Sequence, residues 1–374
     1  MGFVPITEDY PWDRIAPYIQ IASRHPDGVV DLSIGTPVDP TPPFIRHALA
    51  DNADAPGYPT VLGTPRLRQA MVDWFTRNRR VQGLSADGVL ATIGSKELVG
   101  LLPSLLGIGS GDAVVVPRVG YPTYAVGARL AGARVLATDD VADWAERTDV
   151  KLVWLNSPSN PTGEVLDVDR LRAVVTAARE CGAVVAGDEC YAQLPWSQPW
   201  AGDGVPSVLD PRVVGDSHDG VLAAYSLSKQ SNLAGYRAGL LAGDRELIAR
   251  LVLLRRHLGM MLPAPVQVAM SAALADDEHV TQQRERYRRR RELLVPALRQ
   301  ARFAVDHSEA GLYLWARSLD GADCWQLLER LATIGIVAGP GEFYGADSSD
   351  HVRIALTSPD ERIAAAAQRL PSLA

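Results

Sequence analysis

Short apolar runs alternate with segments long enough to form a helix between residues 89 and 243 of this 374-residue chain. The seven runs are residues 89–93, 113–116, 134–137, 151–155, 183–186, 221–225 and 239–242. Several of them lack the alternation of polar and apolar residues that marks a strand with one face in water, so we expect both faces to be buried. The pattern therefore predicts an α/β fold in which a mostly parallel seven-stranded sheet is covered by helices.

The pattern changes after about residue 245. Helical segments at 246–258 and 265–299 lead into strand-like runs at 302–305, 312–315 and 352–356, with a helix at 324–334. A chain of this length can fill two hydrophobic cores. We predict a large domain at residues 46–245 and a smaller α+β domain at 246–374. Residues 1–45 are rich in proline, and we expect them to be irregular.

The charge of the chain argues against a nucleic-acid-binding protein. Its net charge is -7, whereas a face that binds a phosphate backbone normally carries a basic excess. The one basic run, residues 284–292, is interpreted as the solvated face of a long helix. Glu285 lies four residues before Arg289, and Glu292 lies four residues after Arg288, so both pairs suit helical ion pairs.

The cysteines and histidines give no sign of a disulfide framework or a metal site. Cys181, Cys190 and Cys324 have no paired spacing, and no H-E-x-x-H motif is present. Residues 107–112 are glycine-rich but precede a strand-like run, so they are interpreted as a turn and not as a dinucleotide-binding loop. We expect no metal.

Nothing in the sequence indicates a targeting signal or a membrane span. Residues 1–6 lack a charged stretch followed by an apolar core. The longest apolar stretch, residues 98–108, contains Pro103 and is too short to cross a bilayer. We expect a cytoplasmic protein in a reducing compartment.

Polar residues suited to ligand binding follow four of the predicted strands. These residues are Gly94, Ser95 and Lys96 after the first run, Asn160 after the fourth, Asp188 and Tyr191 after the fifth, and Lys229 after the sixth. In parallel sheets, ligands bind beyond the carboxyl ends of the strands. The sequence therefore predicts a site in which a phosphate cradle, an amide, a carboxylate with a tyrosine, and a lysine meet.

Lys229 is one of only three lysines in the chain, which otherwise uses arginine. A lysine amine can become a nucleophile through burial or neighbouring charge, whereas a guanidinium stays protonated. The hydroxyls of Ser226 and Ser228 and the guanidinium of Arg237 could converge on a phosphate dianion. The alternative at this point is an exposed loop lysine beside helix-capping serines.

The segment from Ser226 to Gly239 resembles the S-x-S-K-x-x-x-x-x-G-x-R-x-G signature of the aminotransferases that use pyridoxal 5'-phosphate and adopt fold type I. The segment that starts at Tyr58 resembles the Y-x-x-x-x-G-x-x-x-L-R motif of the same family. Closer still, residues 226–237, 94–97 and 263–267 resemble actinobacterial N-succinyldiaminopimelate aminotransferases. The resemblance implies a homodimer, and an N-terminal segment at 1–45 that packs on the small domain and the active site.

The resemblance also implies a role for each candidate residue. Lys229 would hold the cofactor and transfer the substrate proton, and Asp188 would face the pyridine nitrogen. The remaining assignments are Asn160 and Tyr191 at the phenolic oxygen, Tyr121 stacked on the ring, Gly94, Ser95, Lys96, Ser226, Ser228 and Arg237 around the phosphate, Tyr58 reaching the phosphate of the other subunit, and Gly35 and Arg353 at the substrate carboxylate. Lys229, Asp188 and Tyr191 are the expected catalytic residues. The alternatives without a functional role are that Arg353 is an ordinary arginine on a surface strand and that Tyr58 is an ordinary tyrosine in a turn before a helix.

The implied reaction is amino-group transfer between an amino acid and a 2-keto acid. The substrate implied is N-succinyl-LL-2,6-diaminopimelate with 2-oxoglutarate and glutamate as the second pair, a step of lysine and diaminopimelate biosynthesis. An aspartate or aromatic aminotransferase and a carbon–sulfur β-lyase remain open, since they share the same cofactor chemistry. A cofactor-binding regulatory protein without turnover is a third possibility, although the short N-terminal segment leaves no room for a DNA-binding module.

Overall fold

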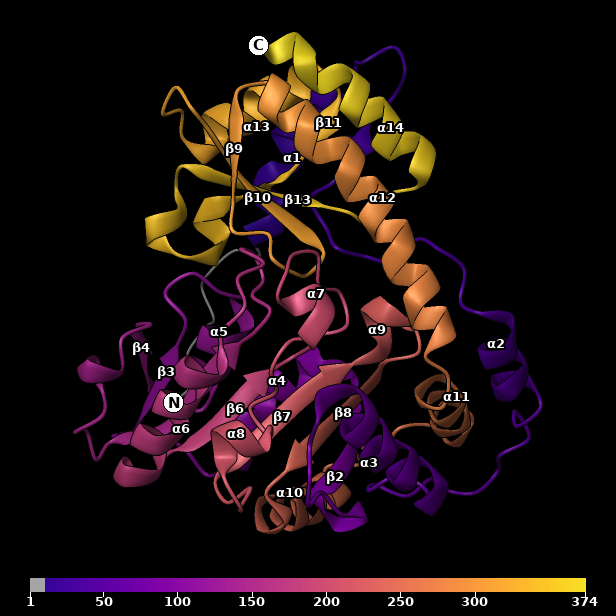
Figure 1. Cartoon of the computed structure of the whole chain (residues 1–374), viewed down its shortest axis with the longest axis vertical. Coiled ribbons are helices and arrows are strands. Elements are labelled where there is room, and N and C mark those ends of the chain that lie inside the picture. The colour runs from indigo at the N-terminus through magenta and orange to yellow at the C-terminus, as the bar shows by residue number, and fades with distance from the viewer. Residues whose placement is uncertain (1–10) are drawn as a thin grey trace, which may run out of the picture.

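The seven apolar runs form one sheet in the computed structural model, which describes residues 11–374 (Figure 1). In spatial order its strands are β2 (Val89–Ile93), β8 (Ala238–Gly243), β7 (Val221–Ser226), β6 (Val184–Asp188), β5 (Val150–Asn156), β3 (Ala113–Val116) and β4 (Arg134–Ala137). Strand β8 runs antiparallel to both of its neighbours, and the pairs from β7 to β4 are parallel. The predicted fold class is confirmed.

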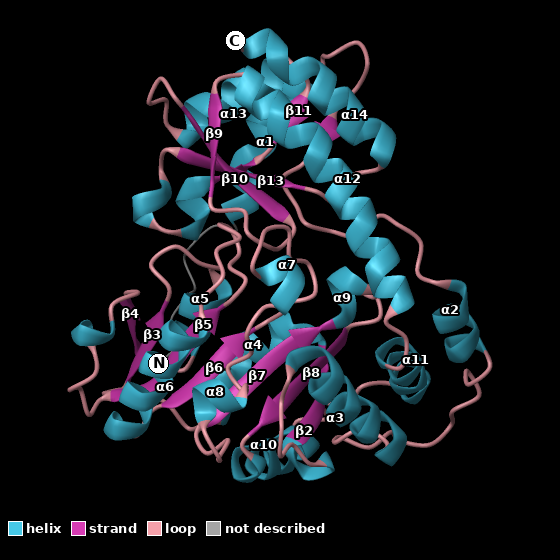
Figure 2. Cartoon of the chain, in the orientation of Figure 1, coloured by secondary structure: helices cyan, strands magenta, loops and turns pink. Residues whose placement is uncertain are grey.

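Both faces of this sheet are buried, as the apolar runs predict. In β7, Val221, Ala223 and Tyr225 face one hydrophobic cluster, whereas Leu222 and Ala224 face another. Helices that contribute to the first cluster are α3 (Pro65–Arg79), α6 (Val168–Cys181), α8 (Pro211–Val214) and α11 (Ala264–Leu274). Helices that contribute to the second are α4 (Gly94–Leu105), α5 (Thr123–Leu130) and α10 (Arg245–His257). Figure 2 shows the helices on either side of the strands.

A second, antiparallel sheet is built from the C-terminal part of the chain. Its strands, in order, are β12 (Gly339–Pro340), β13 (His351–Ala355), β10 (Tyr313–Ser318) and β9 (Phe303–Asp306). The helices that share its hydrophobic cluster are α1 (Ala16–Ala22), α12 (Glu278–Gln300), α13 (Cys324–Thr333) and α14 (Asp360–Arg369). Figure 1 shows α12 running from α11, beside the large sheet, up to α14.

The N-terminal residues are more regular than the sequence suggested. They contain α1, the strand β1 (Val30–Asp31), which pairs with β11 (Ile336–Val337), and α2 (Pro43–Ala50), which packs against α11. We expected irregular structure because the segment is rich in proline. Pro17 and Pro43 instead occupy the first turns of helices, where a missing N–H costs nothing. The first ten residues of the segment predicted at 1–45 lie outside the described residues. The domain boundaries at 45 and 245 stay predictions.

The remaining elements are short. They are the helices α7 (Trp200–Asp203) and α9 (Leu227–Gln230) and the 3-10 helices Pro11–Ile15, Ala86–Gly88, Val141–Asp143, Gly341–Tyr344, Ala346–Ser348 and Leu370–Leu373. Within residues 11–374, no helix combines the length and the apolar character that a membrane span requires. The prediction that residues 1–6 carry no targeting signal lies outside the described residues.

The helical segment predicted at 265–299 is two helices. Helix α11 ends at Leu274 and α12 begins at Glu278; just before α12, the side chain of Asp276 accepts a hydrogen bond from the backbone N–H of His279 in its first turn (2.9 Å). The solvated basic face of α12 is confirmed at Arg288, which pairs with Glu285 (2.6 Å). Arg290 in the same run is buried instead.

A buried ion pair holds the segment that follows β6. Both side chains, Arg79 at the end of α3 and Glu189 after Asp188, are at most 2% exposed, and they pair at 2.7 Å. Glu189 also accepts hydrogen bonds from the hydroxyl of Ser207 (2.8 Å) and the backbone N–H of Val208 (2.7 Å). Breaking a buried pair leaves an uncompensated charge, so this one fixes the position of the chain around Asp188.

Replacing Glu189 should therefore destabilise the fold strongly. We expect Glu189→Ala to lower the free energy of unfolding by about 3–5 kcal/mol, since Arg79 would stay buried without its partner. Glu285→Ala, which breaks an exposed pair, is the control and should cost far less, because exposed ion pairs are screened by solvent. Urea denaturation measures both values, and equal losses for the two variants would contradict this reading.

Candidate active site

Lys229 lies on the one-turn helix α9, directly after the buried strand β7. Ser226 caps this helix, because its hydroxyl oxygen accepts a hydrogen bond from the backbone N–H of Ser228 (3.2 Å). The hydroxyl of Ser226 in turn donates to that of Ser228 (2.9 Å). Both serines are buried and Lys229 is partly buried, so the lysine is not the exposed loop residue of the alternative reading.

The amine of Lys229 donates a hydrogen bond to the backbone carbonyl of Gly35. Burial is the main cause that lowers the pKa of this amine; Tyr313 opposes the shift, while the positive charges of Arg353 and Arg237 add to it. A lowered pKa raises the fraction of neutral amine near neutral pH. The structure thus gives Lys229 the character of a nucleophile and a base.

A polar network from α12 fixes the segment after Lys229. The hydroxyl of Ser231 meets Nε2 of His279 at 2.8 Å, and Nδ1 of His279 meets the carboxylate of Asp276 at 2.7 Å. Ser231, His279 and Asp276 are the residue types of a hydrolase catalytic triad. Ser231 is fully buried, however, so no substrate reaches its hydroxyl. The hydroxyl of Tyr287 also donates to the backbone carbonyl of Lys229 (3.3 Å). These contacts hold the lysine helix in place.

Asp188 ends β6, one strand away from β7. Its carboxylate accepts hydrogen bonds from the hydroxyl of Tyr124 (2.9 Å) and the backbone N–H of Cys190 (3.2 Å). Burial raises the pKa of this carboxyl, and within residues 11–374 no cationic side chain pairs with it. A buried carboxylate of this kind favours a cationic ligand group. The prediction missed Tyr124, which lies in the first turn of α5, three residues after Tyr121.

Tyr121 lies between the exposed Lys96 and the buried Tyr124. The amine of Lys96 is 5.9 Å from the Tyr121 ring, and the rings of Tyr121 and Tyr124 meet edge to face at 5.9 Å. Burial raises the pKa of Tyr121 to about 12, so its phenol is neutral at physiological pH. Ser95, beside Lys96, interacts with the buried Cys190 thiol. The first turn of α4 therefore borders the region around Asp188.

Several anion-binding groups converge where α4 begins. Strand β8 lies between β2 and β7, and its register places Gly239 opposite Ser226. A Cβ atom at Gly94 would collide with the guanidinium of Arg237, so that guanidinium rests on the amino terminus of α4. Gly94 has φ +74°, a conformation that glycine adopts readily. Backbone amides of the first turn of α4, the guanidinium and the hydroxyls of α9 form an environment that suits a phosphate.

Arg353 is buried in β13 and has no acidic partner. Its two terminal nitrogens donate to the side-chain oxygen of Asn160 (2.9 Å) and the backbone carbonyl of Ser33 (2.7 Å), whereas its Nε has no hydrogen-bond partner. The guanidinium lies 4.0 Å from the ring centre of Tyr313 and 4.9 Å from that of Tyr344. Within residues 11–374 no carboxylate forms an ion pair with it. A buried cation that forms no ion pair favours an anionic ligand.

Tyr191 and Gly35 meet at Tyr313, a residue that the sequence did not indicate. The hydroxyls of Tyr191 and Tyr313 are 3.4 Å apart. A Cβ atom at Gly35 would collide with the Tyr313 hydroxyl, so the two residues are in close contact. Tyr58, in contrast, is 95% exposed and takes no part in this cluster within the chain.

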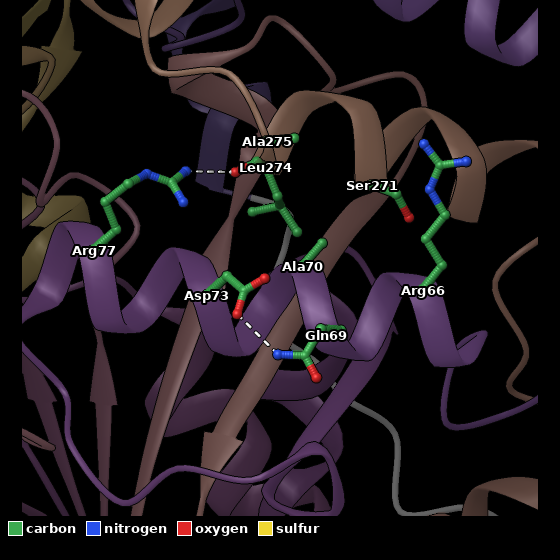
Figure 3. A pocket seen from close by; sticks show the side chains of 8 residues that line it. All are labelled: Arg66, Gln69, Ala70, Asp73, Arg77, Ser271, Leu274 and Ala275. Atoms are coloured by element: carbon green, nitrogen blue, oxygen red, sulfur yellow. Dashed lines mark hydrogen bonds between the residues drawn. The ribbon is translucent and has the colours of Figure 1, made fainter.

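A separate pocket of about 430 Å³ lies on the surface between α3 and α11 (Figure 3). It is lined by Arg66, Gln69, Ala70, Asp73, Arg77, Ser271, Leu274 and Ala275, none of which belongs to the predicted site. Its polar groups are partly engaged, since Arg77 donates to the carbonyl of Leu274 (2.8 Å) and Gln69 donates to Asp73 (2.8 Å). Among residues 11–374, no group of three or more Cys, His, Asp and Glu side chains is arranged to hold a metal ion.

Comparison with known proteins identifies the family of the chain. Residues 27–370 match the family described as aminotransferase class I and II. The chain is 54% identical to a probable aminotransferase of Mycobacterium tuberculosis, over 96% of this chain and 84% of the relative. It is 52% identical to the 4-dedimethylamino-4-oxo-anhydrotetracycline transaminase OxyQ of Streptomyces rimosus, over 97% and 98% of the two chains.

Its structure also resembles that of a probable N-succinyldiaminopimelate aminotransferase of Thermus thermophilus, with a TM-score of 0.85, 29% identity, and coverage of 97% of this chain and 100% of the other. The relatives are transaminases, so the alternative of a regulatory protein without turnover loses its support. The match of fold and sequence leads to one conclusion. The chain belongs to the class I and II aminotransferases, enzymes that depend on pyridoxal 5'-phosphate.

Proposed function

We propose that this aminotransferase moves an amino group between N-succinyl-LL-2,6-diaminopimelate and 2-oxoglutarate, with glutamate as the other amino acid. The observation that carries the proposal is Arg353, a buried guanidinium with a free Nε and no acidic partner among residues 11–374. Amino and keto acids both bring the carboxylate that this cation lacks. The Thermus thermophilus neighbour, named for N-succinyldiaminopimelate, supports the choice of substrate.

The similarity to OxyQ supports a second candidate, a ketone on a tetracycline-type ring. An amino-acid donor would bring a carboxylate to Arg353 in that case as well, so Arg353 does not separate the two acceptors. Aspartate or aromatic aminotransferase activity and carbon–sulfur β-elimination would use the same cofactor site. The identity of the acceptor therefore has to be measured.

The residues present fit pyridoxal 5'-phosphate. The amine of Lys229 would hold its aldehyde carbon, and the amino terminus of α4, with Ser226, Ser228 and Arg237, would hold its phosphate. The unpaired carboxylate of Asp188 suits the protonated pyridine nitrogen. When bound, the cofactor supplies an electron sink for the electron pair left when the substrate loses its α-proton.

On the phenolic side of the cofactor, Asn160 and Tyr191 would donate hydrogen bonds. Asn160 is fixed for this role because its backbone N–H donates to the side chain of Asn156 (2.7 Å) and its side-chain oxygen accepts from Arg353. Tyr121 would lie against the ring, since its half-buried side chain borders the Asp188 region. Lys96, which is exposed, would act at the edge of the phosphate site.

The chain's own residues would divide the reaction between them. Arg353 binds the substrate carboxylate through its free Nε and orients the α-carbon, beside the Gly35 backbone. The desolvated amine of Lys229 accepts the α-proton as a general base, because its lowered pKa raises the fraction of neutral amine. Asp188 would pair with the protonated ring nitrogen, which would favour the ionised form of the carboxyl and keep the ring electron-poor.

Tyr58 would complete the site of a second copy of the chain. It is 95% exposed, which is unusual for a large aromatic side chain and leaves its hydroxyl free to reach a partner's phosphate. We therefore propose a homodimer. The location in the cytoplasm also stays a prediction.

The acceptor can be identified from the cofactor's visible absorbance. Glutamate should convert the cofactor of the purified protein to its amine form, and the keto acid derived from N-succinyl-LL-2,6-diaminopimelate should restore the original spectrum. Oxaloacetate, an aromatic keto acid and a tetracycline-type ketone are the competing acceptors. Restoration by one of these alone would replace the proposed substrate, and release of a thiol from a sulfur amino acid would favour the β-lyase.

Replacing Arg353 should weaken every substrate that has an α-carboxylate. We expect Arg353→Met to lower kcat/KM for glutamate by about 30- to 4,000-fold, because removing one partner of a buried charge pair costs about 2–5 kcal/mol. Arg317→Met is the matched control, since Arg317 lies on neighbouring β10 but is partly exposed and paired with Asp306 (2.8 Å). Steady-state kinetics with glutamate measure both. An unchanged kcat/KM in Arg353→Met would exclude Arg353 as the carboxylate site.

A further inference from the structure

A buried arginine, Arg255, holds the carboxylate of Glu97. Glu97 lies in the first turn of α4, and Arg255 lies in the last turn of α10. Two nitrogens of the guanidinium donate separately to the two carboxylate oxygens, at 2.7 and 3.1 Å. The side chain of Arg255 is fully buried, whereas that of Glu97 is 18% exposed. The planar guanidinium therefore engages both oxygens of Glu97 at once.

Helices α4 and α10 fix this pair from both sides. They pack into the same hydrophobic cluster, to which α4 contributes Leu98 and α10 contributes Leu251. The carboxyl end of a helix favours a cation, so the last turn of α10 is a suitable place for Arg255. In residues 11–374 Glu97 is the only acidic residue that pairs with Arg255, whose Nε has no hydrogen-bond partner. The charge of Arg255 is thus directed at Glu97.

A glutamate in the first turn of a helix ordinarily competes with other anions for the helix end. Its carboxylate is stabilised by the free backbone N–H groups and often turns back to accept hydrogen bonds from them. Helix α4, however, has no side-chain cap. The guanidinium of Arg237, which rests against Gly94, makes its one side-chain hydrogen bond within residues 11–374 to the carbonyl of Ala234 (2.8 Å). The groups that suit a phosphate are therefore not taken by the carboxylate in the same turn.

We propose that Arg255 is a positioning residue that keeps the carboxylate of Glu97 away from the amino terminus of α4, so that this terminus and Arg237 stay available for the cofactor phosphate. The inference rests on the proposed function, in which the same terminus holds the phosphate. Arg255 also offsets the negative charge that Glu97 places near a phosphate dianion. It acts through Glu97 and not by contact with the cofactor.

Two probes measure how much the phosphate contributes to binding. The full-length chain, freed of cofactor, is titrated with pyridoxal 5'-phosphate and with pyridoxal, which has the same ring and aldehyde but no phosphate. Equilibrium dialysis gives a Kd for each probe. The Kd of pyridoxal divided by that of pyridoxal 5'-phosphate is the phosphate ratio. A substitution that loosens the site around the ring weakens both probes and leaves this ratio unchanged.

Arg255→Met should lower the phosphate ratio about 5- to 30-fold, the size of the interaction between a helix terminus and a partly buried charge. Adding Glu97→Gln to Arg255→Met should restore the ratio to within about threefold of the unsubstituted chain, because the competing charge is then absent. Glu97→Gln alone should leave the ratio unchanged or raise it. Arg256→Met is the matched control, since Arg256 lies beside Arg255 on α10 but is exposed, and it should leave the ratio unchanged.

The results that would overturn the inference differ from those that would overturn the proposed function. If Arg255→Met leaves the phosphate ratio unchanged, or if the double variant is no better than Arg255→Met, the pair is a structural contact between two helices and the proposed function stands. A lowered ratio in Glu97→Gln leads to the same conclusion, even if Arg255→Met fails to fold. If the unsubstituted chain binds pyridoxal as tightly as pyridoxal 5'-phosphate, the phosphate site itself is wrong.

Discussion

An excess of positive charge around a desolvated amine is the constraint on which this site depends, because Arg353 is buried and Arg237 is exposed beside Lys229. Lys229, Arg237 and Arg353 lie close enough to influence one another, and among residues 11–374 the one carboxylate buried beside them, Asp188, pairs with none of them. Like charges this close destabilise each other unless anions arrive. In the proposed function, a phosphate at Arg237 and a carboxylate at Arg353 would relieve that repulsion.

The large sheet holds these charged side chains in place. Strand β7 is buried along its whole length and delivers Lys229, and the neighbouring strand β6 delivers Asp188. The Arg79–Glu189 pair, with its hydrogen bonds to backbone groups, anchors the chain next to Asp188. Arg353 comes from the second sheet and donates to Asn160, which follows β5 of the large sheet, so the proposed carboxylate site lies where the two sheets meet.

Much of this could be predicted from the sequence, because the informative signals are local. The seven strands follow from runs of apolar residues, and the positions of Lys229, Asp188 and Asn160 follow from the ends of those strands. The break between α11 and α12 was missed, since only three residues, 275–277, separate the two helices and no proline or glycine marks the break. Tyr313 was also missed, because its importance comes from the pairing of β10 with β13 and from contact with Gly35, which is remote in sequence.

The most direct test of the account uses the scarcity of lysine. The chain has only Lys96, Lys151 and Lys229, so borohydride reduction of the cofactor-loaded protein, followed by proteolysis and mass spectrometry, gives an unambiguous answer. Burial and neighbouring positive charge make Lys229 the reactive amine, and we predict that the pyridoxyl group is found on its peptide alone. A label on Lys96 or Lys151, or no covalent label at all, would contradict the account.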